Sequence, residues 1–292
     1  MAIMIEEDCN VIDRSEDILD SILSRTGAMF MPVAVEALKD ISREEEFWFG
    51  VFKADLMDHL RVKVDPRSLQ LAVQDLENLA LVFARIIDYR SHFTATHSAG
   101  VAAVAEILAR ILGFSEENCR IIKIAGFLHD LGKLAVPTEL LEKRSHLDQR
   151  EYIHVQDHAA YTHKLLEKVP DLGYGIIWAS QHHERLDGSG YPDHSIADEI
   201  AFGSRVVAVA DIFTAVTEDR PYRKRMSRNE ALLELKHLTD RGYLDTEVFE
   251  AAASNYEFLD EIRIEAQDAA LLDFRERMDP FLQEGKECEG IN

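Results

Sequence analysis

The sequence predicts an all-α fold: a helical bundle preceded by a helical N-terminal segment. From about residue 66, apolar residues recur at helical spacing between recognisable helix starts and ends, while strand-type alternation is scarce. Of the 292 residues, 47% are hydrophobic and 29% are charged, which is typical of a globular domain. We therefore expect two parts, an N-terminal segment of unknown role in residues 1–65 and a bundle in residues 66–292.

Residues 1–65 contain apolar patches around Ile18 and Ile22 and in MFMPVAVEAL, separated by charged clusters such as residues 42–46. The segment is too short for most independent sensor domains. It is interpreted either as a helical cap on the bundle or as a surface for a partner, and the cap is the simpler of the two.

Two helices are predicted between residues 97 and 129. In HSAGVAAVAEILARILG one helical face is apolar up to Gly113, and it comprises Val101, Val104, Ala105, Leu108 and Leu112. Ser115 has the side chain of an N-cap, and Glu116 and Glu117 suit the first turn of the next helix. That helix carries Ile121, Ile124, Ala125 and Leu128 and reaches His129.

Further helices follow at regular intervals. Asp148 and Glu151 resemble a capping box for the helix that bears His158 and closes before Pro170. GYGIIWASQHHE is predicted as a helix that ends with His182 and His183, and Ser227 with Glu230 opens another. Residues 260–278 read as a long charged helix with an apolar stripe, made of Ile262, Ala266, Ala269 and Leu272.

Composition limits the function and the location. The formal net charge of −22, from 54 acidic and 32 basic side chains, disfavours binding to a long nucleic acid. A small phosphorylated substrate remains compatible, because a bound metal would supply positive charge locally. Cys9, Cys119 and Cys288 are too few and too scattered for a disulfide framework or a thiolate metal site, so a reducing cytoplasm is expected. No apolar stretch predicts membrane insertion or a secretory signal.

Histidines and carboxylates are concentrated in three short stretches. GFLHDLGK contains His129 and Asp130, QDHAA contains His158, and QHHERLDGSGYP contains His182, His183 and Asp187. Nitrogen and oxygen ligands at this density, with no cysteine among them, indicate a hydrolytic metal site. His154 lies one helical turn before His158, and spacing alone does not choose between them.

Asp211 is an isolated carboxylate in the apolar stretch VVAVADIFTAV, where an unpaired charge is unfavourable. It is the natural candidate for a further acidic ligand, and an ion pair with Arg205 is the alternative. Asp187, Gly188 and Gly190 favour a turn that ends at Tyr191 and Pro192. We expect a loop with exposed backbone amides beside the metal site.

The motifs HDLGK, HHERLDGSGYP and DIFTAVTEDRPYR resemble the HD-GYP subgroup of the HD-domain phosphohydrolases, over about residues 81–255. The resemblance implies an HD-domain helical bundle with two or three metal ions, usually iron or manganese. It also implies hydrolysis of the bacterial second messenger cyclic di-GMP.

Carried over by position, the resemblance selects His158 over His154 and moves Asp187 to the substrate-facing loop. Asp130 is expected to bridge two ions, and Lys133 to contact the scissile phosphate, so these two residues are the expected catalytic ones. The implied metal ligands are His97, His129, Asp130, His158, His182, His183 and Asp211. The implied substrate-binding residues are Lys133, Asp187, Gly188, Gly190, Tyr191, Arg220 and Arg223.

The sequence also departs from the family pattern. Phe93 stands where three-metal members carry a glutamate, so we expect two divalent ions, iron or manganese, and a preference for the linear product pGpG over GMP. Lys143-Arg144-Ser145, His194-Ser195 and Ile200-Ala201 replace turn residues of the family, which alters loop shape more than the metal ligands.

The expected reaction is attack on cyclic di-GMP by a hydroxide held between two ions, with Lys133 stabilising the transition state. One alternative is an HD phosphohydrolase for another nucleotide, including a mixed cyclic dinucleotide. The other is a slow, metal-loaded scaffold that binds cyclic di-GMP or a GGDEF-domain protein. GGDEF-domain proteins and a second copy of the chain are the protein partners that the resemblance leaves open.

Overall fold

The computed structural model describes residues 15–26, 30, 32–43, 73–90, 96–141, 143, 146–219 and 224–288. These residues form helices joined by loops, and their only β-type pairing consists of two isolated bridges, Thr26 with Phe30 and Asp187 with Ile196. The predicted all-α class is confirmed. The chain divides into two compact units, one comprising Met1–Gln70 and Pro280–Asn292 and the other Leu71–Asp279.

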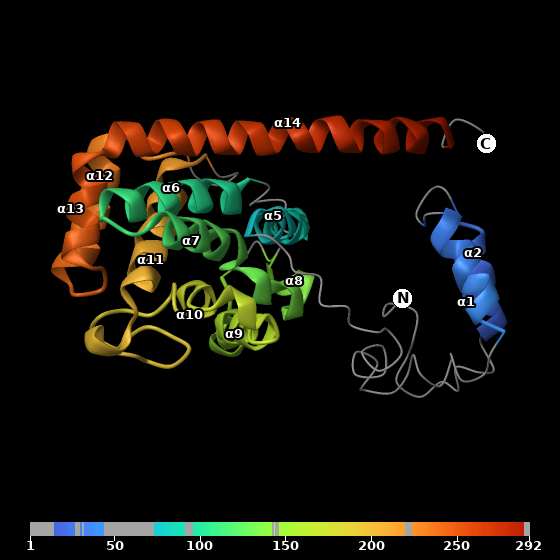
Figure 1. Ribbon diagram of the computed structural model, residues 1–292, viewed down its shortest axis with the longest axis horizontal. Coiled ribbons are helices and arrows are strands. Elements are labelled where there is room, and N and C mark those ends of the chain that lie inside the picture. Colours follow the sequence, from blue (N-terminus) through green and yellow to red (C-terminus); the bar gives the residue numbers. More distant parts are fainter. Residues whose placement is uncertain are drawn as a thin grey trace. The chain divides into compact units, whose positions relative to one another are not determined.

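The first unit contains helices α1 (Ser15–Leu23) and α2 (Pro32–Ile41), labelled in Figure 1. Ile18 and Ile22 of α1 and Val35 of α2 are buried and form a small apolar cluster. Partly buried Leu23, Phe30 and Leu38 pack against this cluster. The apolar patches seen in the sequence here therefore pack α1 against α2.

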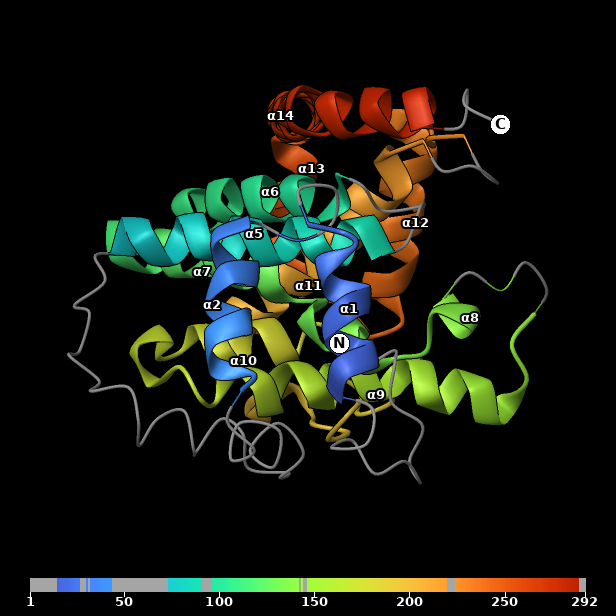
Figure 2. The ribbon, with the colours of Figure 1, turned by 90° about the vertical axis from the view of Figure 1, so that its right-hand side faces the viewer.

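The second unit is built from α-helices and short 3-10 helices (Figures 1 and 2). In chain order these are α5 (Val73–Arg90), α6 (His97–Ile111), α7 (Glu116–Leu128), η3 (Leu131–Ala135), α8 (Thr138–Leu141), α9 (Gln149–Leu166), η4 (Pro170–Leu172), α10 (Gly175–Ser180), η5 (Ala197–Glu199), α11 (Phe202–Thr217), α12 (Arg228–Asp240), α13 (Thr246–Ser254) and α14 (Tyr256–Cys288), whose residues from Pro280 on belong to the first unit. Helix α6 packs against both α7 and α11, and α9 packs against η3 and α10. These contacts bring together segments that carry the predicted site residues.

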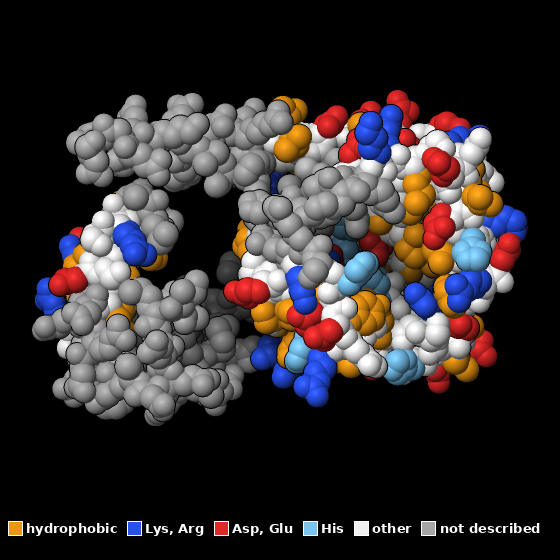
Figure 3. Space-filling view, turned by 180° about the vertical axis from the view of Figure 1, so that it is seen from behind, with side chains coloured by type: hydrophobic (Ala, Val, Ile, Leu, Met, Phe, Trp, Pro, Cys, Tyr) orange, Lys and Arg blue, Asp and Glu red, His pale blue; other side chains and the backbone are white. Residues whose placement is uncertain are grey.

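Charged side chains of both signs lie on the face of the molecule drawn in Figure 3, where Lys and Arg are interspersed with Asp and Glu. The coloured, described residues of that face form no continuous basic track of the kind that a nucleic-acid backbone requires.

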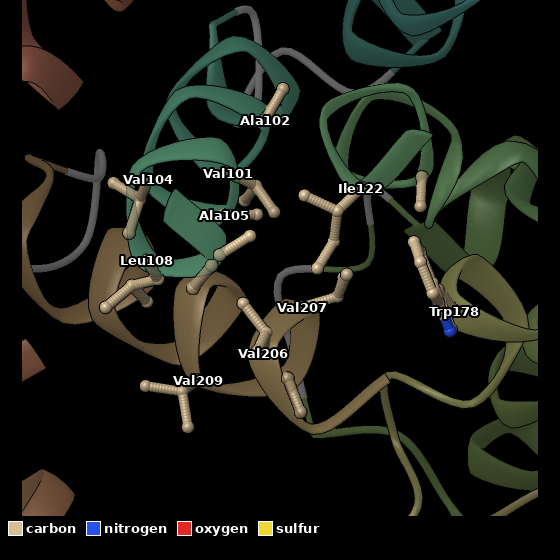
Figure 4. Close-up of a cluster of buried hydrophobic side chains, with 14 of the residues drawn as sticks. Val101, Ala102, Val104, Ala105, Leu108, Ile122, Trp178, Val206, Val207 and Val209 are labelled. Carbon is tan, nitrogen blue, oxygen red and sulfur yellow. The ribbon is translucent and has the colours of Figure 1, made fainter. Parts of the chain in front are cut away.

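The core lies where α6, α7 and α11 meet. Figure 4 shows Val101 of α6 and Ile122 of α7 converging with Val206 and Val207 of α11, and all four side chains are fully buried. Helix α11 is apolar around most of its circumference, and most of its residues are buried, as expected of a central helix. Asp211 therefore reaches the site from inside the bundle.

The predicted helix starts agree with the structure. Ser115 Oγ accepts a hydrogen bond from Asn118 N at 3.2 Å, and Asp148 with Glu151 forms the expected capping box. Two helix ends differ from the prediction. Helix α10 ends at Ser180, so His182 and His183 lie in the following turn, and α14 extends beyond the predicted residues 260–278 at both ends.

None of the helices in the described ranges combines the length and the apolar character needed to span a membrane.

Candidate metal centre

The seven predicted metal ligands come together in two groups. Within each group, one potential ligand atom per residue lies within 4.8 Å of the others. The first group consists of Asp130, His158, His182 and His183, and the second of His97, His129 and Asp211. They are contributed by α6, α9 and α11 and by the turns that follow α7 and α10.

Three of the histidines are oriented by the backbone of their own helical turn. The Nδ1 atoms of His129, His158 and His182 lie 2.7, 2.6 and 2.7 Å from the carbonyl oxygens of the residues three positions earlier. Because a carbonyl only accepts, each Nδ1 must carry the proton. In the neutral ring, the lone pair is then on Nε2 and faces the other site residues.

Two of these lone pairs have no hydrogen-bond partner. Within the described part of the chain, His158 Nε2 and His182 Nε2 are buried and make no hydrogen bond. Burial lowers the pKa of both rings, and it lowers that of His183 to about 3, with the neighbouring His158 as a further cause. Neutral imidazoles with buried, unpaired nitrogens are the form that coordinates a metal ion. The donor set thus fits a divalent cation.

Asp130 lies between the two groups. Its Oδ2 atom is 3.2 Å from His129 Nε2, and its Oδ1 atom is 3.4 Å from His158 Nε2. Lys133 Nζ donates to Oδ2 at 2.5 Å. Although burial would raise it, the pKa of Asp130 is held well below its usual value by Lys133 and His129, so this carboxylate is ionised. Its two oxygens are directed at different histidine groups.

His97 is held by carboxylates on both ring nitrogens. Nε2 lies 3.1 Å from Asp211 Oδ1, and Nδ1 lies 3.1 and 3.2 Å from the two oxygens of Glu218. Burial alone would lower the pKa of His97, but these carboxylates raise it to about 10. Arg205, the alternative partner considered for Asp211, pairs with Asp245 instead, at 2.9 Å.

The loop that contains the GYP residues borders the first group. Tyr191 packs against the rings of His183 and His158, with centroid distances of 4.8 and 6.2 Å. Buried Glu184 organises the loop, since its carboxylate accepts from Asp193 N at 2.7 Å and from Ser195 N at 3.0 Å.

Three amides of this loop, which were expected to be exposed, donate hydrogen bonds to acceptors in residues 183–187. Gly188 N donates to Arg185 O, Ser189 N to Asp187 Oδ1 and Tyr191 N to His183 O, at 2.8, 2.9 and 3.2 Å. A tight turn satisfies its own donors, and for these three amides the prediction is wrong.

The structure distinguishes His158 from His154, the alternative ligand on the same helix. The side chain of His154 is 68% exposed, whereas His158 is 2% exposed and lies in the centre. Phe93, Arg220 and Arg223 lie outside the described residues.

Sequence reasoning missed two buried carboxylates near His97. Glu218 follows Asp211 by seven residues, or two helical turns, and this spacing could have identified it. Asp88 of α5 accepts from the amide and hydroxyl groups of Ser98, at 3.2 and 2.8 Å. It is the one acid in the largely apolar run LALVFARIID, which also contains Arg85, so its signal is weaker than the one that identified Asp211.

A family model described as HD domain matches residues 81–248. The chain belongs to the HD domain family. Its HDLGK and HHERLDGSGYP motifs add the HD-GYP signature, and the membership inferred from sequence is confirmed.

Curated relatives of this HD domain protein include two bacterial phosphodiesterases. The 3′3′-cGAMP-specific phosphodiesterase 1 of Vibrio cholerae is 34% identical over 234 residues, which are 79% of this chain and 54% of the relative. The cyclic di-GMP phosphodiesterase response regulator RpfG of Xanthomonas campestris is 39% identical over 151 residues, which are 51% and 40% of the two chains. The chain thus spans about half the length of the curated relatives it matches.

A solved structure is also similar. The crystal structure of a cyclic GMP-AMP specific phosphodiesterase of V. cholerae is 30% identical and covers 83% of this chain and 56% of its own, with a TM-score of 0.47.

Proposed function

We propose that this HD domain protein is a metal-dependent phosphodiesterase that hydrolyses a cyclic dinucleotide. The observation that carries the proposal is the pair of buried, unpaired Nε2 atoms of His158 and His182 beside the ionised Asp130. Such atoms are unfavourable in a folded protein unless a ligand completes them. The activities named for the relatives supply the substrate class.

Two ions are proposed, one for each group of ligands. Asp130 would bridge them, because its two oxygens are directed at different groups. When bound, divalent ions lower the pKa of a coordinated water and neutralise charge that develops on phosphoryl oxygens. The donor set is compatible with iron and manganese, the ions that the family resemblance implies.

Lys133 and Tyr191 are the proposed substrate contacts beside the ligands. Although burial lowers it, the pKa of Lys133 is raised by Asp130, so its ammonium group is charged and would stabilise a phosphoryl oxygen. Burial raises the pKa of Tyr191, which keeps its hydroxyl protonated and able to donate a hydrogen bond. The turn amide of Ser189 lowers the pKa of Asp187, which makes this carboxylate a poor proton donor to the leaving oxygen.

Cyclic di-GMP is the proposed substrate, with the linear dinucleotide pGpG as the first product. The mixed dinucleotide 3′3′-cGAMP is the second candidate, because relatives that match most of this chain are named for it.

The test is turnover of both cyclic dinucleotides by anaerobic protein loaded with iron or manganese, together with its metal content. We expect about two ions per chain and conversion of one substrate to a linear dinucleotide. Asp130→Asn and His158→Ala should each lose metal and at least about 100-fold in activity. His154→Ala is the matched control, since His154 lies on the same helix but is exposed.

A fully loaded protein that binds either dinucleotide without cleaving it would refute the proposal and favour the scaffold alternative. Equal losses in His154→Ala and His158→Ala would refute the ligand assignment.

A further inference from the structure

His97 differs from His129, His158 and His182 in how its ring is oriented. Those three each use the carbonyl of the preceding helical turn. His97 is the first residue of α6, so no earlier turn of that helix offers a carbonyl. Its Nδ1 atom instead contacts Glu218, which follows the last residue of α11 and is 8% exposed.

Glu218 is itself held by α14. Gln267 Nε2 donates to Glu218 Oε2 at 2.9 Å, and Gln267 Oε1 accepts from Arg263 Nη1. Arg263 is 3% exposed, and its Nε and Nη2 atoms donate to Asp260 Oδ1 at 2.9 and 2.5 Å. A continuous series of hydrogen bonds therefore joins α14 to His97.

The residues of this hydrogen-bond series also pack against α6. Gly100 lies one turn after His97 and faces the same part of α14. A Cβ atom at residue 100 would lie 3.0 Å from Gln267 Nε2, 3.2 Å from Arg263 Cγ and 2.9 Å from Thr214 Cγ2. Glycine at this position thus leaves room for Thr214 of α11 and for the side chains of Gln267 and Arg263 of α14 beside α6.

We propose that Glu218, with Gln267 and Arg263 behind it, positions His97 for the ion of the second ligand group. The inference rests on the proposed metal site. A carboxylate on the second nitrogen of a ligating histidine sets the tautomer and ring orientation and makes the ring a better ligand. Gln267 and Arg263 act through Glu218, so all three are positioning residues. They act through His97, which belongs to the second ligand group alone, so their effect is specific to one ion.

The experiment counts ions per chain in the full-length protein while a chelator is titrated, for the wild type, Glu218→Ala, Glu218→Gln and Gln267→Leu. We expect one ion to be held about 10- to 100-fold more weakly in Glu218→Ala, while the other keeps wild-type affinity. Gln267→Leu removes the hydrogen bond to the Glu218 carboxylate and the one from Arg263, and it should weaken the same ion about fivefold. Glu218→Gln retains an acceptor for Nδ1–H and should restore part of the affinity.

A second readout does not depend on metal. In ion-free protein labelled with ¹⁵N-histidine, the ring-nitrogen shifts of His97 should change in Glu218→Ala and Gln267→Leu. Glu265→Leu, an exposed site on the same helix, is the control and should change neither the shifts nor the ion affinities.

The inference is overturned if both variants keep two ions at wild-type affinity with unchanged His97 shifts. Equal weakening of both ions would also overturn it, because that result means general loss of structure. A two-ion wild type that cleaves no cyclic dinucleotide would refute the proposed function and leave this inference intact.

Discussion

At the scale of single residues, four of the five site histidines take their orientation from the group that contacts Nδ1. A backbone carbonyl does this for His129, His158 and His182, and a carboxylate does it for His97. The first arrangement is local, because the carbonyl oxygen belongs to the residue three positions earlier in the same helical turn. The second joins His97 to Glu218 across 121 positions of sequence, and only the fold brings them together.

Asp88 gives the site region a pH-dependent stability. Burial raises the pKa of this carboxyl group to about 7, even though His97 and the hydrogen bonds from Ser98 act to lower it. An unfolded chain has a carboxyl pKa of about 4. Between about pH 4 and pH 7 the folded state therefore binds a proton that the unfolded state does not, and stability falls as pH rises.

Asp88→Asn should remove this dependence. In ion-free protein, the stability of the variant relative to wild type should increase by on the order of a few kcal/mol from pH 4 to pH 7. Urea unfolding at several pH values measures the difference, and Asp268→Asn, at an exposed position of α14, is the control. A difference between variant and wild type that stays constant with pH would contradict the assignment.

At the scale of elements, the centre depends on close contact between η3 and α9. A Cβ atom on Gly132, the glycine of HDLGK, would lie 1.8 Å from His158 O and 2.7 Å from Thr162 N. Gly132 N donates to Thr162 Oγ1 at 2.9 Å, and that hydroxyl donates to His129 O at 3.1 Å. This glycine therefore keeps the turn that bears His129 and Asp130 close to the helix that bears His158.

Gly132→Ala should be strongly destabilising, because backbone atoms on both sides must move. We expect about 3 kcal/mol or more, the upper end for an overpacked site. Gly113→Ala separates this effect from backbone strain, since Gly113 has a φ of 81° but open space around it and should lose only about 1–2 kcal/mol. Denaturant unfolding measures both, and a smaller loss for Gly132→Ala would contradict the packing argument.

At the scale of the whole molecule, the centre gathers residues from three helices and from the turns after two others, in a 292-residue chain with a net charge of −22. Its two groups contain two carboxylates and five histidines, and bound cations would complete the buried nitrogens that have no hydrogen-bond partner. Metal binding and folding stability should consequently be coupled.

Addition of manganese to ion-free protein should therefore raise the melting temperature. At about 100 times the dissociation constant, one site contributes about 2.7 kcal/mol, or roughly 5–10 °C for a domain of this size. Thermal unfolding with manganese and then with excess chelator measures the rise and its reversal. Asp130→Asn should show little of this rise, and an unchanged melting temperature in the wild type would contradict the coupling.

Local chemistry in the sequence was enough to predict much of the fold and of the site. Helix starts at Ser115, Asp148 and Ser227 follow from side chains that bond to amides within three residues, so the sequence alone identifies them. The metal site could be predicted for a similar reason, because its ligands include two pairs of adjacent residues, His129 with Asp130 and His182 with His183. Asp211 was found because an isolated charge in an apolar helix needs a partner.

The grouping of these residues required the tertiary structure. Packing of α6 on α7 and α11 places His97 with His129 and Asp211, and packing of α9 on η3 and α10 places His158 with Asp130 and His182. Glu218 and Gln267 escaped sequence reasoning because their partners, His97 and Glu218, lie 121 and 49 positions away in the chain. Contacts within one helical turn follow from the spacing of residues in the sequence. Contacts between helices depend on how their buried faces pack, and no short stretch of sequence determines this packing.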